Sequence, residues 1–471
     1  MLDESVRYLI VFSGSALIIA LFFISPLRSM VLIVALQKVI DIFWFIQVSV
    51  GSFAFSIQRL VYAAVPIVGI GVLLSEAKKR KIPMSVPPIK VLMILFFLWF
   101  VLGVIRSPGE AQDGVERLLK VAAGFTMFGI GWYYLDSEEK YDQFAKLFIF
   151  TYLIAFAGVM LQLTGIFKME YIGVAQQVES QTGAEALTGE EATTRYPGFY
   201  NDAGTAAMYL FTAIPLCLYF IYKNEPKKWL YQAMLAICVL GVILSFVRGT
   251  WLTAGLIVFG WLFINKEFGK IFGAVGVVAG LIIAGTFLGQ FFQAFFGDIF
   301  RSIEAGKLVG ISGKAVRIDI IQEKFSELNF FEKLFGAGYG GNSVAISSVT
   351  GRLKDSAETD FYGYLYDFGI IGWLLYYGIP VIALFLTWRN ILRCKPEIYG
   401  KALNLKYKVS FAMLCGAFFA YFGSGSKWVS FTFPLYFLLG FALKRPEFFA
   451  LKRVETENTI QLNPRLEPRL N

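Results

Sequence analysis

The sequence contains no histidine, few cysteines and few charged residues, and each shortage excludes a class of function. Without histidine the chain cannot form a Ser-His-Asp triad, a histidine-ligated zinc site or a histidine proton relay. The four cysteines are scattered and three of them lie inside apolar runs, so we expect neither a disulfide framework nor a metal cluster. We therefore expect a protein that uses no metal and no cofactor.

Charged residues make up only 16% of the 471 residues, whereas 57% are hydrophobic. An average soluble domain has about a quarter charged residues. Apolar runs of about 17 to 25 residues recur along the chain, which is the length that crosses a hydrocarbon core of about 30 Å. These runs lack the alternation of barrel strands. The composition therefore predicts an all-α, polytopic integral membrane protein.

The apolar runs predict about thirteen spans. They are 7–24, 30–47, 56–75, 89–105, 121–135, 147–163, 206–222, 230–247, 250–264, 271–288, 361–387, 409–422 and 429–443. The second and third are interrupted by polar residues, namely Gln37, Lys38, Asp41 and Arg59. One of these two segments could be re-entrant or bent, so the prediction is about 12 to 14 transmembrane helices.

The net charge of +9 is better explained by membrane orientation than by nucleic-acid binding. Lysines and arginines gather after the third, seventh, ninth and eleventh spans and after the last one. All these loops fall on one side, which the positive-inside rule makes cytoplasmic. The loop around 136–146 mixes acidic and basic residues, but acidic residues have little influence on orientation.

This orientation divides the chain into six parts. They are N-terminal transmembrane helices (1–163), an acidic extracytoplasmic loop (164–205), central transmembrane helices with Arg248 (206–288), a large extracytoplasmic loop (289–360), C-terminal transmembrane helices (361–443) and a cytoplasmic tail (444–471). The large loop is predicted to contain an amphipathic helix from Lys314 to Leu334. Loops this long often carry function, so we look for chemistry on the outer face.

Arg248 is the most informative polar residue, because it lies between one apolar run that ends and another that begins at once. An arginine at such a junction is costly unless it has a partner or reaches the interface. It is therefore either a functional residue or an anchor that extends to lipid phosphates.

A second cluster leads from the acidic loop into the seventh span. Arg195 can donate two hydrogen bonds to a phosphate or carboxylate. Gly198, Asn201 and Gly204 are turn and cap residues that would place a helix N-terminus beside it. The same residues would also suffice for a plain loop-to-helix turn.

Two further segments border the eleventh span. The glycines of Phe335 to Asn342 allow a ligand to approach the backbone closely, although their spacing is not a nucleotide motif. Glu358 and Asp360 lie at the mouth of the span, where either could act as a general base. Alternatively, these carboxylates cap the helix N-terminus.

Taken in order, these segments resemble the O-antigen ligase and polysaccharide polymerase superfamily of bacterial inner membranes. The matching residues are Arg195, Gly198, Phe199, Asn201, Ser245, Arg248, Gly336, Gly338, Glu358, Asp360, Gly369 and Gly372. They cover roughly 190–390. Ligases of this family carry a histidine where this chain has Glu358, and this departure favours a polymerase.

The resemblance implies a metal-independent glycosyltransferase of the class C fold, with its active site on the periplasmic side of the inner membrane. The donor would be a polyprenyl-diphosphate-linked glycan and the acceptor a glycan or a lipid-linked glycan. Membrane lipids and a chain-length regulator protein are the other candidate partners. The implied catalytic residues are Glu358, Asp360, Arg195 and Arg248, and the implied substrate-binding residues are Arg317, Tyr196, Tyr200, Asn201, Gly338 and Tyr339.

Three other functions compete with a polymerase: an O-antigen ligase with lipid A core as acceptor, a transporter or flippase, and a non-catalytic assembly protein. A transporter needs polar groups along a path near the middle of the bilayer. The candidates above lie mostly at outer span ends, while mid-span charges such as Asp41 are confined to the second and third segments. This distribution favours an enzyme that works at the outer face.

Overall fold

The computed structural model describes residues 4–46, 48–50, 53–80, 87–107, 111–167, 197–200, 203–245, 247–270, 273, 313–350, 360–423 and 429–451. The helices are α1 (Glu4–Ile24), α2 (Pro26–Ile40), η1 (Asp41–Phe45), α3 (Ile57–Arg80), α4 (Pro87–Ile105), α5 (Ala111–Tyr134), α6 (Glu138–Leu163), α8 (Ala203–Lys223), α9 (Lys228–Leu244), α10 (Arg248–Ile264), α13 (Gly313–Glu327), α14 (Phe330–Phe335), α15 (Gly341–Thr350), α16 (Asp360–Arg393), α17 (Pro396–Tyr399), α18 (Lys401–Gly423) and α19 (Val429–Ala442). Strands β1 (Val48–Val50) and β2 (Phe53–Phe55) form a short antiparallel hairpin.

The chain is a helical membrane protein. Within the described residues, 6 helices are long and apolar enough to cross a membrane: α1, α3, α4, α6, α8 and α16. Three shorter apolar helices, in α9, α10 and α19, also coincide with predicted spans. The predicted span 271–288 lies outside the described residues, apart from Gly273.

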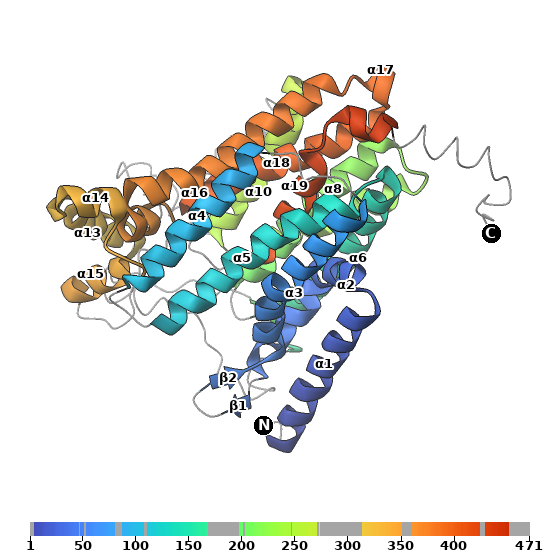
Figure 1. Ribbon diagram of the computed structural model, residues 1–471. Helices are drawn as coiled ribbons and strands as arrows, with labels where there is room; N and C mark the ends of the chain where they lie inside the picture. Colours follow the sequence, from blue (N-terminus) through green and yellow to red (C-terminus); the bar gives the residue numbers. More distant parts are fainter. Residues whose placement is uncertain are drawn as a thin grey trace, which may run out of the picture.

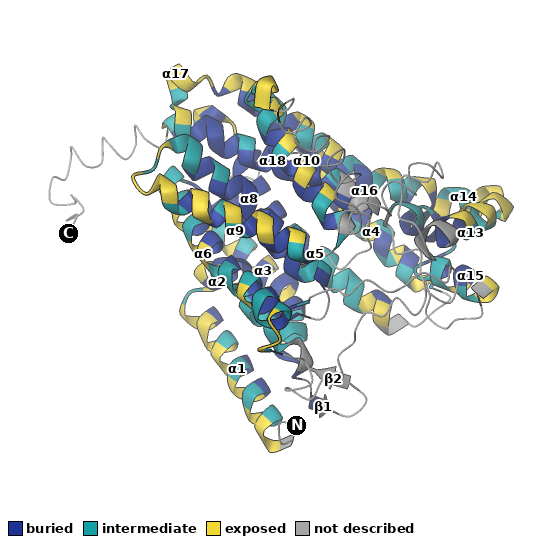
Figure 2. Cartoon of the chain, turned by 180° about the vertical axis from the view of Figure 1, so that it is seen from behind, coloured by how far each residue is buried: buried dark blue, intermediate teal, exposed yellow. Residues whose placement is uncertain are grey.

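Helix α8 runs through the centre of the bundle and packs against α6, α9, α10, α18 and α19 (Figure 1). Its residues are buried along most of its length, whereas α1 exposes most of its surface (Figure 2). Exposed leucines and phenylalanines on α1 and α4 are those expected where a helix faces lipid.

Glycines bring two of these helices into direct backbone contact. A Cβ atom on Gly131 of α5 would lie 2.0 Å from the carbonyl oxygen of Phe437 in α19. A Cβ atom on Gly440 would lie 2.3 Å from the amide nitrogen of Trp132. Small residues at helix crossings allow this approach, which strengthens packing between helices in lipid.

Two predicted helices differ from the observed ones. The predicted span 30–47 is α2 up to Ile40, after which η1 and β1 follow. The amphipathic helix predicted from Lys314 to Leu334 is wrong as a single helix. It is interrupted after Glu327, because Asn329 leaves the helical conformation and caps α14 by accepting from the amide of Glu332 at 3.0 Å.

The two ends of the bundle differ in chemistry. One end, here called the glycine end, carries α13, α14 and α15 together with the start of α16 (Figure 1). The other, here called the lysine end, joins the starts of α6 and α18 to the end of α8. The described parts of the loops that follow the seventh, ninth and eleventh spans meet at this lysine end, as the basic residues predicted.

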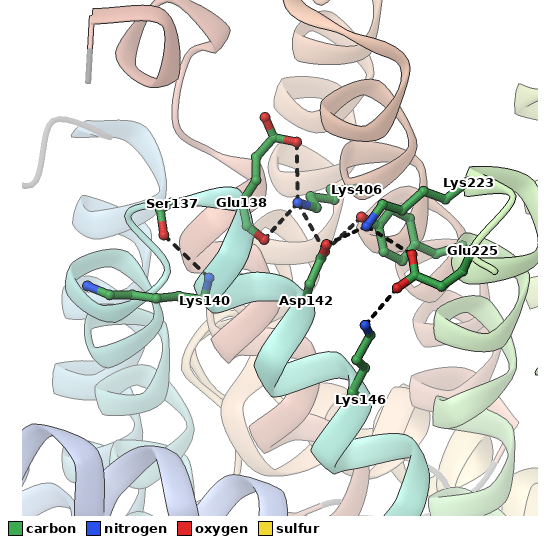
Figure 3. Close-up of polar contacts among 9 residues, drawn as sticks. Ser137, Glu138, Lys140, Asp142, Lys146, Lys223, Glu225 and Lys406 are labelled. Atoms are coloured by element: carbon green, nitrogen blue, oxygen red, sulfur yellow. Dashed lines mark hydrogen bonds and ion pairs between the residues drawn. The ribbon is translucent and has the colours of Figure 1, made fainter. Parts of the chain in front are cut away.

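Opposite charges alternate in a network at the lysine end (Figure 3). Lys406 is fully buried and lies 3.3 Å from the Glu138 carboxylate and 3.1 Å from that of Asp142. Lys223 continues the network to Asp142 and Glu225, at 2.7 and 3.2 Å. The acidic residues around 136–146 thus pair with basic residues from the ends of two other helices.

Glu225 provides a pH-dependent test of the network. Partial burial acts to raise its pKa, but hydrogen bonds from Lys146 and Lys223 outweigh burial and lower the pKa below the ordinary value. A depressed folded-state pKa contributes stability that is present at neutral pH and is lost as the pH falls through it. We expect Glu225→Gln to lower the free energy of unfolding by about 1 kcal/mol at neutral pH.

The measurement is the apparent melting temperature in detergent, which should be lower for Glu225→Gln than for wild type at neutral pH. The gap should close in acid, where wild-type Glu225 is protonated too. Glu139→Gln is the matched control, because this glutamate is exposed and, within the described part of the chain, accepts a hydrogen bond only from Gln143 of its own helix. A gap that is equal at both pH values would contradict the assignment.

Candidate functional site

Helix α16 is broken near its start, at the glycine end. Gly369 adopts φ 68° and ψ −177°, which is not helical and which L side chains rarely adopt. The break releases backbone carbonyl groups from helical hydrogen bonds. Such groups need other partners in a membrane, so broken helices are found where protein covers them or where they line a cavity.

The released carbonyl groups bind the segment that precedes α15. The amides of Ala337 and Gly338 donate to the carbonyl oxygens of Tyr366 and Asp367, both at 2.9 Å. The indole of Trp99 in α4 donates to the carbonyl oxygen of Phe368 at 3.0 Å. A loop segment and α4 therefore complete the hydrogen bonding of the broken helix.

Two glycines touch across this contact, which we call the glycine joint: residues 334–342 docked on residues 366–369. A Cβ atom on Gly336 would lie 2.2 Å from the carbonyl oxygen of Asp367 and 2.5 Å from the amide of Gly369. A Cβ atom on Gly369 would lie 2.3 Å from the carbonyl oxygen of Leu334. Both positions also have positive φ, so the joint requires glycine twice over.

The side chain of Asp367 holds the start of α15. Its carboxylate is buried and accepts from the amides of Gly340 (3.1 Å) and Asn342 (2.7 Å). The side-chain amide of Asn342 donates a third hydrogen bond, also at 2.7 Å. A carboxylate in this place satisfies free amides at the helix N-terminus and is favoured by its dipole.

The end of α4 supports the joint from the other side. One guanidinium nitrogen of Arg106 donates to the carbonyl oxygens of Phe335 (2.6 Å) and Gly336 (2.9 Å). Ser107 donates to the carbonyl oxygen of Tyr339 at 2.6 Å, and the amide of Tyr339 donates to Gly103 at 2.9 Å. Arg106 is otherwise exposed, so its remaining N–H groups are accessible to an anion.

Of the predicted substrate-binding residues, Gly338 and Tyr339 lie in this joint. The Tyr339 ring is half-buried and lies 5.7 Å from that of Phe100 and 6.4 Å from that of Phe368. Arg317 is buried on α13, next to the joint, because α13 packs against α15 and α16. Asp360 is the first residue of α16.

The described part of the second cluster is the turn 197–200. The amide of Gly198 donates to the side chain of Gln162, at the end of α6, at 2.6 Å. Gly198 has φ 64° and touches the backbone of Gly158, so the turn lies directly on α6. Tyr200 is buried, with its ring 5.4 Å from that of Tyr209. A ring buried in this way does not face a sugar in this conformation.

Arg248 is the first residue of α10, as the sequence predicted for the junction. The preceding helix, α9, ends at Leu244. Two side chains close the turn between them: Ser245 and Trp251 both donate to the carbonyl oxygen of Val242, at 2.7 and 2.8 Å. The predicted residues Glu358, Arg195, Tyr196 and Asn201 lie outside the described residues.

Sequence reasoning missed Arg106, Arg117 and Asp367. Arg117 of α5 donates to the hydroxyl of Tyr364 in α16 at 3.1 Å and so brings a second guanidinium to the glycine end. The signal for Arg106 was present, since it directly follows a predicted span. Asp367 carried no such signal, because its partners lie 25 to 27 residues away along the chain.

The site thus combines a broken helix, a glycine-rich docking segment and two arginines at one end of the bundle. Among the described residues, no group of histidine, cysteine, aspartate and glutamate side chains could hold a metal ion. The backbone amides of residues 336–342 already donate within the protein, so the arrangement can bind an anionic group through its guanidinium groups. No protein-family model matches the sequence, and no curated protein matches it significantly.

Proposed function

We propose that the chain is a membrane glycosyltransferase that moves a polyprenyl-diphosphate-linked glycan onto an acceptor hydroxyl, acting as a polysaccharide polymerase. The proposal includes about 12 to 14 spans, the class C fold and an outer-face site in a bacterial inner membrane. Its main support is the glycine joint. Two segments of the family resemblance, at Gly336 to Gly338 and at Gly369, are in direct contact although they are distant in sequence.

In this reaction the acceptor oxygen forms a bond to the anomeric carbon while the bond from that carbon to the diphosphate breaks. The lipid diphosphate leaves with the bonding electrons. Glu358, with Asp360 in reserve, takes the proton of the acceptor hydroxyl. A diphosphate is a good leaving group, and arginines can stabilise its charge without a metal. Arg195 and Arg248 have this task in the proposal, and Arg106 and Arg117 lie at the same end as the joint.

One observation favours a transporter as the second candidate. Lys38 and Asp41 are both buried inside the bundle, and charged groups in that position mark ion or substrate pathways. The transporter proposal is kept for this reason, and an O-antigen ligase remains the nearest alternative among enzymes.

The test incubates purified protein with a polyprenyl-diphosphate oligosaccharide and chelator, and resolves the products by gel and mass spectrometry. We expect a ladder of repeats from wild type. Arg248→Ala and Glu358→Gln should each lower the rate about 100-fold or more, the usual loss when one charge-stabilising or proton-accepting group is removed. Arg393→Ala is the matched control, because Arg393 is an exposed arginine at the lysine end.

Each result leads to a distinct conclusion. A single transfer to added lipid A core would identify a ligase. No transfer to either acceptor, from protein that elutes as a folded monodisperse species, would overturn the transferase proposal and favour the transporter. A loss of activity in Arg393→Ala equal to that in Arg248→Ala would show that Arg248 has no special place in the reaction.

A further inference from the structure

Two opposite charges lie inside the bundle, away from the glycine joint. Lys38 and Asp41 are 0% and 3% exposed, at the end of α2 and the start of η1. The ammonium of Lys38 donates to the carbonyl oxygen of Phe148 at 3.1 Å, and Phe148 lies in the middle part of α6. Ionisable groups at such depth are costly and are retained mainly where they serve a function.

Asp41 is held by neutral donors from two other helices. From α3, Gln58 donates at 2.9 Å and Tyr62 at 2.7 Å. From α8, Tyr209 donates to the second carboxylate oxygen. Lys38 instead lies over the Phe148 ring, 3.3 Å from its centroid, and 5.9 Å from the centroid of Tyr209. Tyr209 therefore lies beside both charges.

The hydroxyl of Tyr200 also lies near this cluster. The Tyr200 ring lies 5.4 Å from that of Tyr209, and the Tyr200 hydroxyl is buried without a hydrogen-bond partner among the described residues. A buried hydroxyl in this state can still accept a hydrogen bond. The carboxylate form of Asp41 has no proton to donate, but the protonated form has one.

Charged side chains connect the cluster to the surface at the glycine end. Lys120 of α5 lies 5.9 Å from the centroid of the Tyr62 ring and 2.8 Å from Glu116. Glu116 lies 3.6 Å from Arg59, at the start of α3. The side chains of these three surface residues are 29 to 39% exposed, so water reaches them.

We propose that Asp41 is a proton-binding site inside the membrane, reached from the glycine end through Arg59, Glu116, Lys120 and Tyr62. A proton taken from water binds one carboxylate oxygen, and the resulting O–H group donates to the Tyr200 hydroxyl. The titratable groups that face Asp41 are Lys38 from α2, Tyr62 from α3, Lys120 from α5, Tyr209 from α8 and Tyr200 from the turn 197–200. This function is separate from glycosyl transfer and does not rest on it.

The test follows protonation by infrared difference spectroscopy of the full-length protein in liposomes. The titration runs between about pH 4 and 9, from the ordinary range of carboxyl groups to the raised range of buried ones. We expect a band from a buried protonated carboxyl group that Asp41→Asn removes. Asp367→Asn is the control and should keep that band. Lys120→Met removes the positive charge beside Tyr62 and should tighten proton binding about tenfold.

The Lys120→Met variant also guards against misfolding of Asp41→Asn, because methionine matches the length of the lysine stem and the Lys120 side chain is 29% exposed. Asp367 is also a buried carboxyl, so the proposal is overturned if Asp41→Asn keeps every buried-carboxyl band of wild type. A wild-type protein with no titrating buried carboxyl would overturn it as well. An unchanged titration in Lys120→Met would also contradict it, since Lys120 would then not act on this site.

Discussion

Gly369→Ala should lower the free energy of unfolding by about 3 kcal/mol or more, because alanine at this position meets both strain and overlap. The new Cβ atom would lie 2.3 Å from the carbonyl oxygen of Leu334 and 2.5 Å from the amide of Gly336. Both neighbours are backbone atoms, which cannot rotate away as a side chain can. The joint must therefore open, leaving the carbonyl groups of Tyr366 and Asp367 without their donors.

The measurements are the apparent melting temperature and the rate of protease cleavage between α13 and α16. Gly378→Ala is the matched control on the same helix, since a Cβ atom there meets only Leu92 side-chain atoms at 3.6 and 4.0 Å. We expect that control to be neutral or slightly stabilising, because alanine favours helix over glycine by about 1 kcal/mol. If the two variants melt alike, the joint does not hold α16 as described.

Gly131→Ala should lower the free energy of unfolding by about 3 to 4 kcal/mol, for a different reason. Gly131 is helical, so alanine brings no backbone strain, but its Cβ would lie 2.0 Å from the carbonyl oxygen of Phe437. Helix α19 would have to move away from α5 and lose packing along the whole crossing. The loss should appear as a lower melting temperature and as aggregation during purification.

Gly71→Ala is the control for Gly131→Ala, because no atom of the other described residues would lie within 4 Å of the added Cβ on α3, apart from the helix's own backbone. Gly440→Ala should reproduce the damage from the facing helix, since its Cβ would meet the amide of Trp132. The double variant, Gly131→Ala with Gly440→Ala, should lower the free energy of unfolding by less than the sum of the two single variants. One separation of the helices relieves both overlaps. Full additivity would show that the two glycines act in separate contacts.

Hydrophobic length accounts for most of the fold that could be predicted. Twelve of the spans predicted from apolar runs overlap observed helices, because a helix that crosses lipid needs a long apolar segment. Boundaries were less accurate where a helix extends beyond the apolar run. Helix α5 begins at Ala111 rather than near 121, because its first turns carry Asp113, Glu116 and Lys120 at the surface of the glycine end.

The candidate site was predictable in its segments and not in its contacts. The glycines at 336, 338 and 369 are visible in the sequence. Their contact depends on a break in α16, which a hydropathy pattern does not predict. Lys38 and Asp41 interrupt the predicted span 30–47. Their hydrogen bonds come from Phe148, Gln58, Tyr62 and Tyr209, and no local pattern reveals partners so far apart.

The broken start of α16 also sets an order of events during biosynthesis. As the chain enters the membrane, the carbonyl groups of Tyr366, Asp367 and Phe368 have no helical partners of their own. Their donors are Ala337 and Gly338 on the preceding loop and Trp99 on α4, all of which are made earlier. The nascent α16 can therefore leave the insertion machinery for lipid only after α4 and the segment 334–342 have gathered beside it.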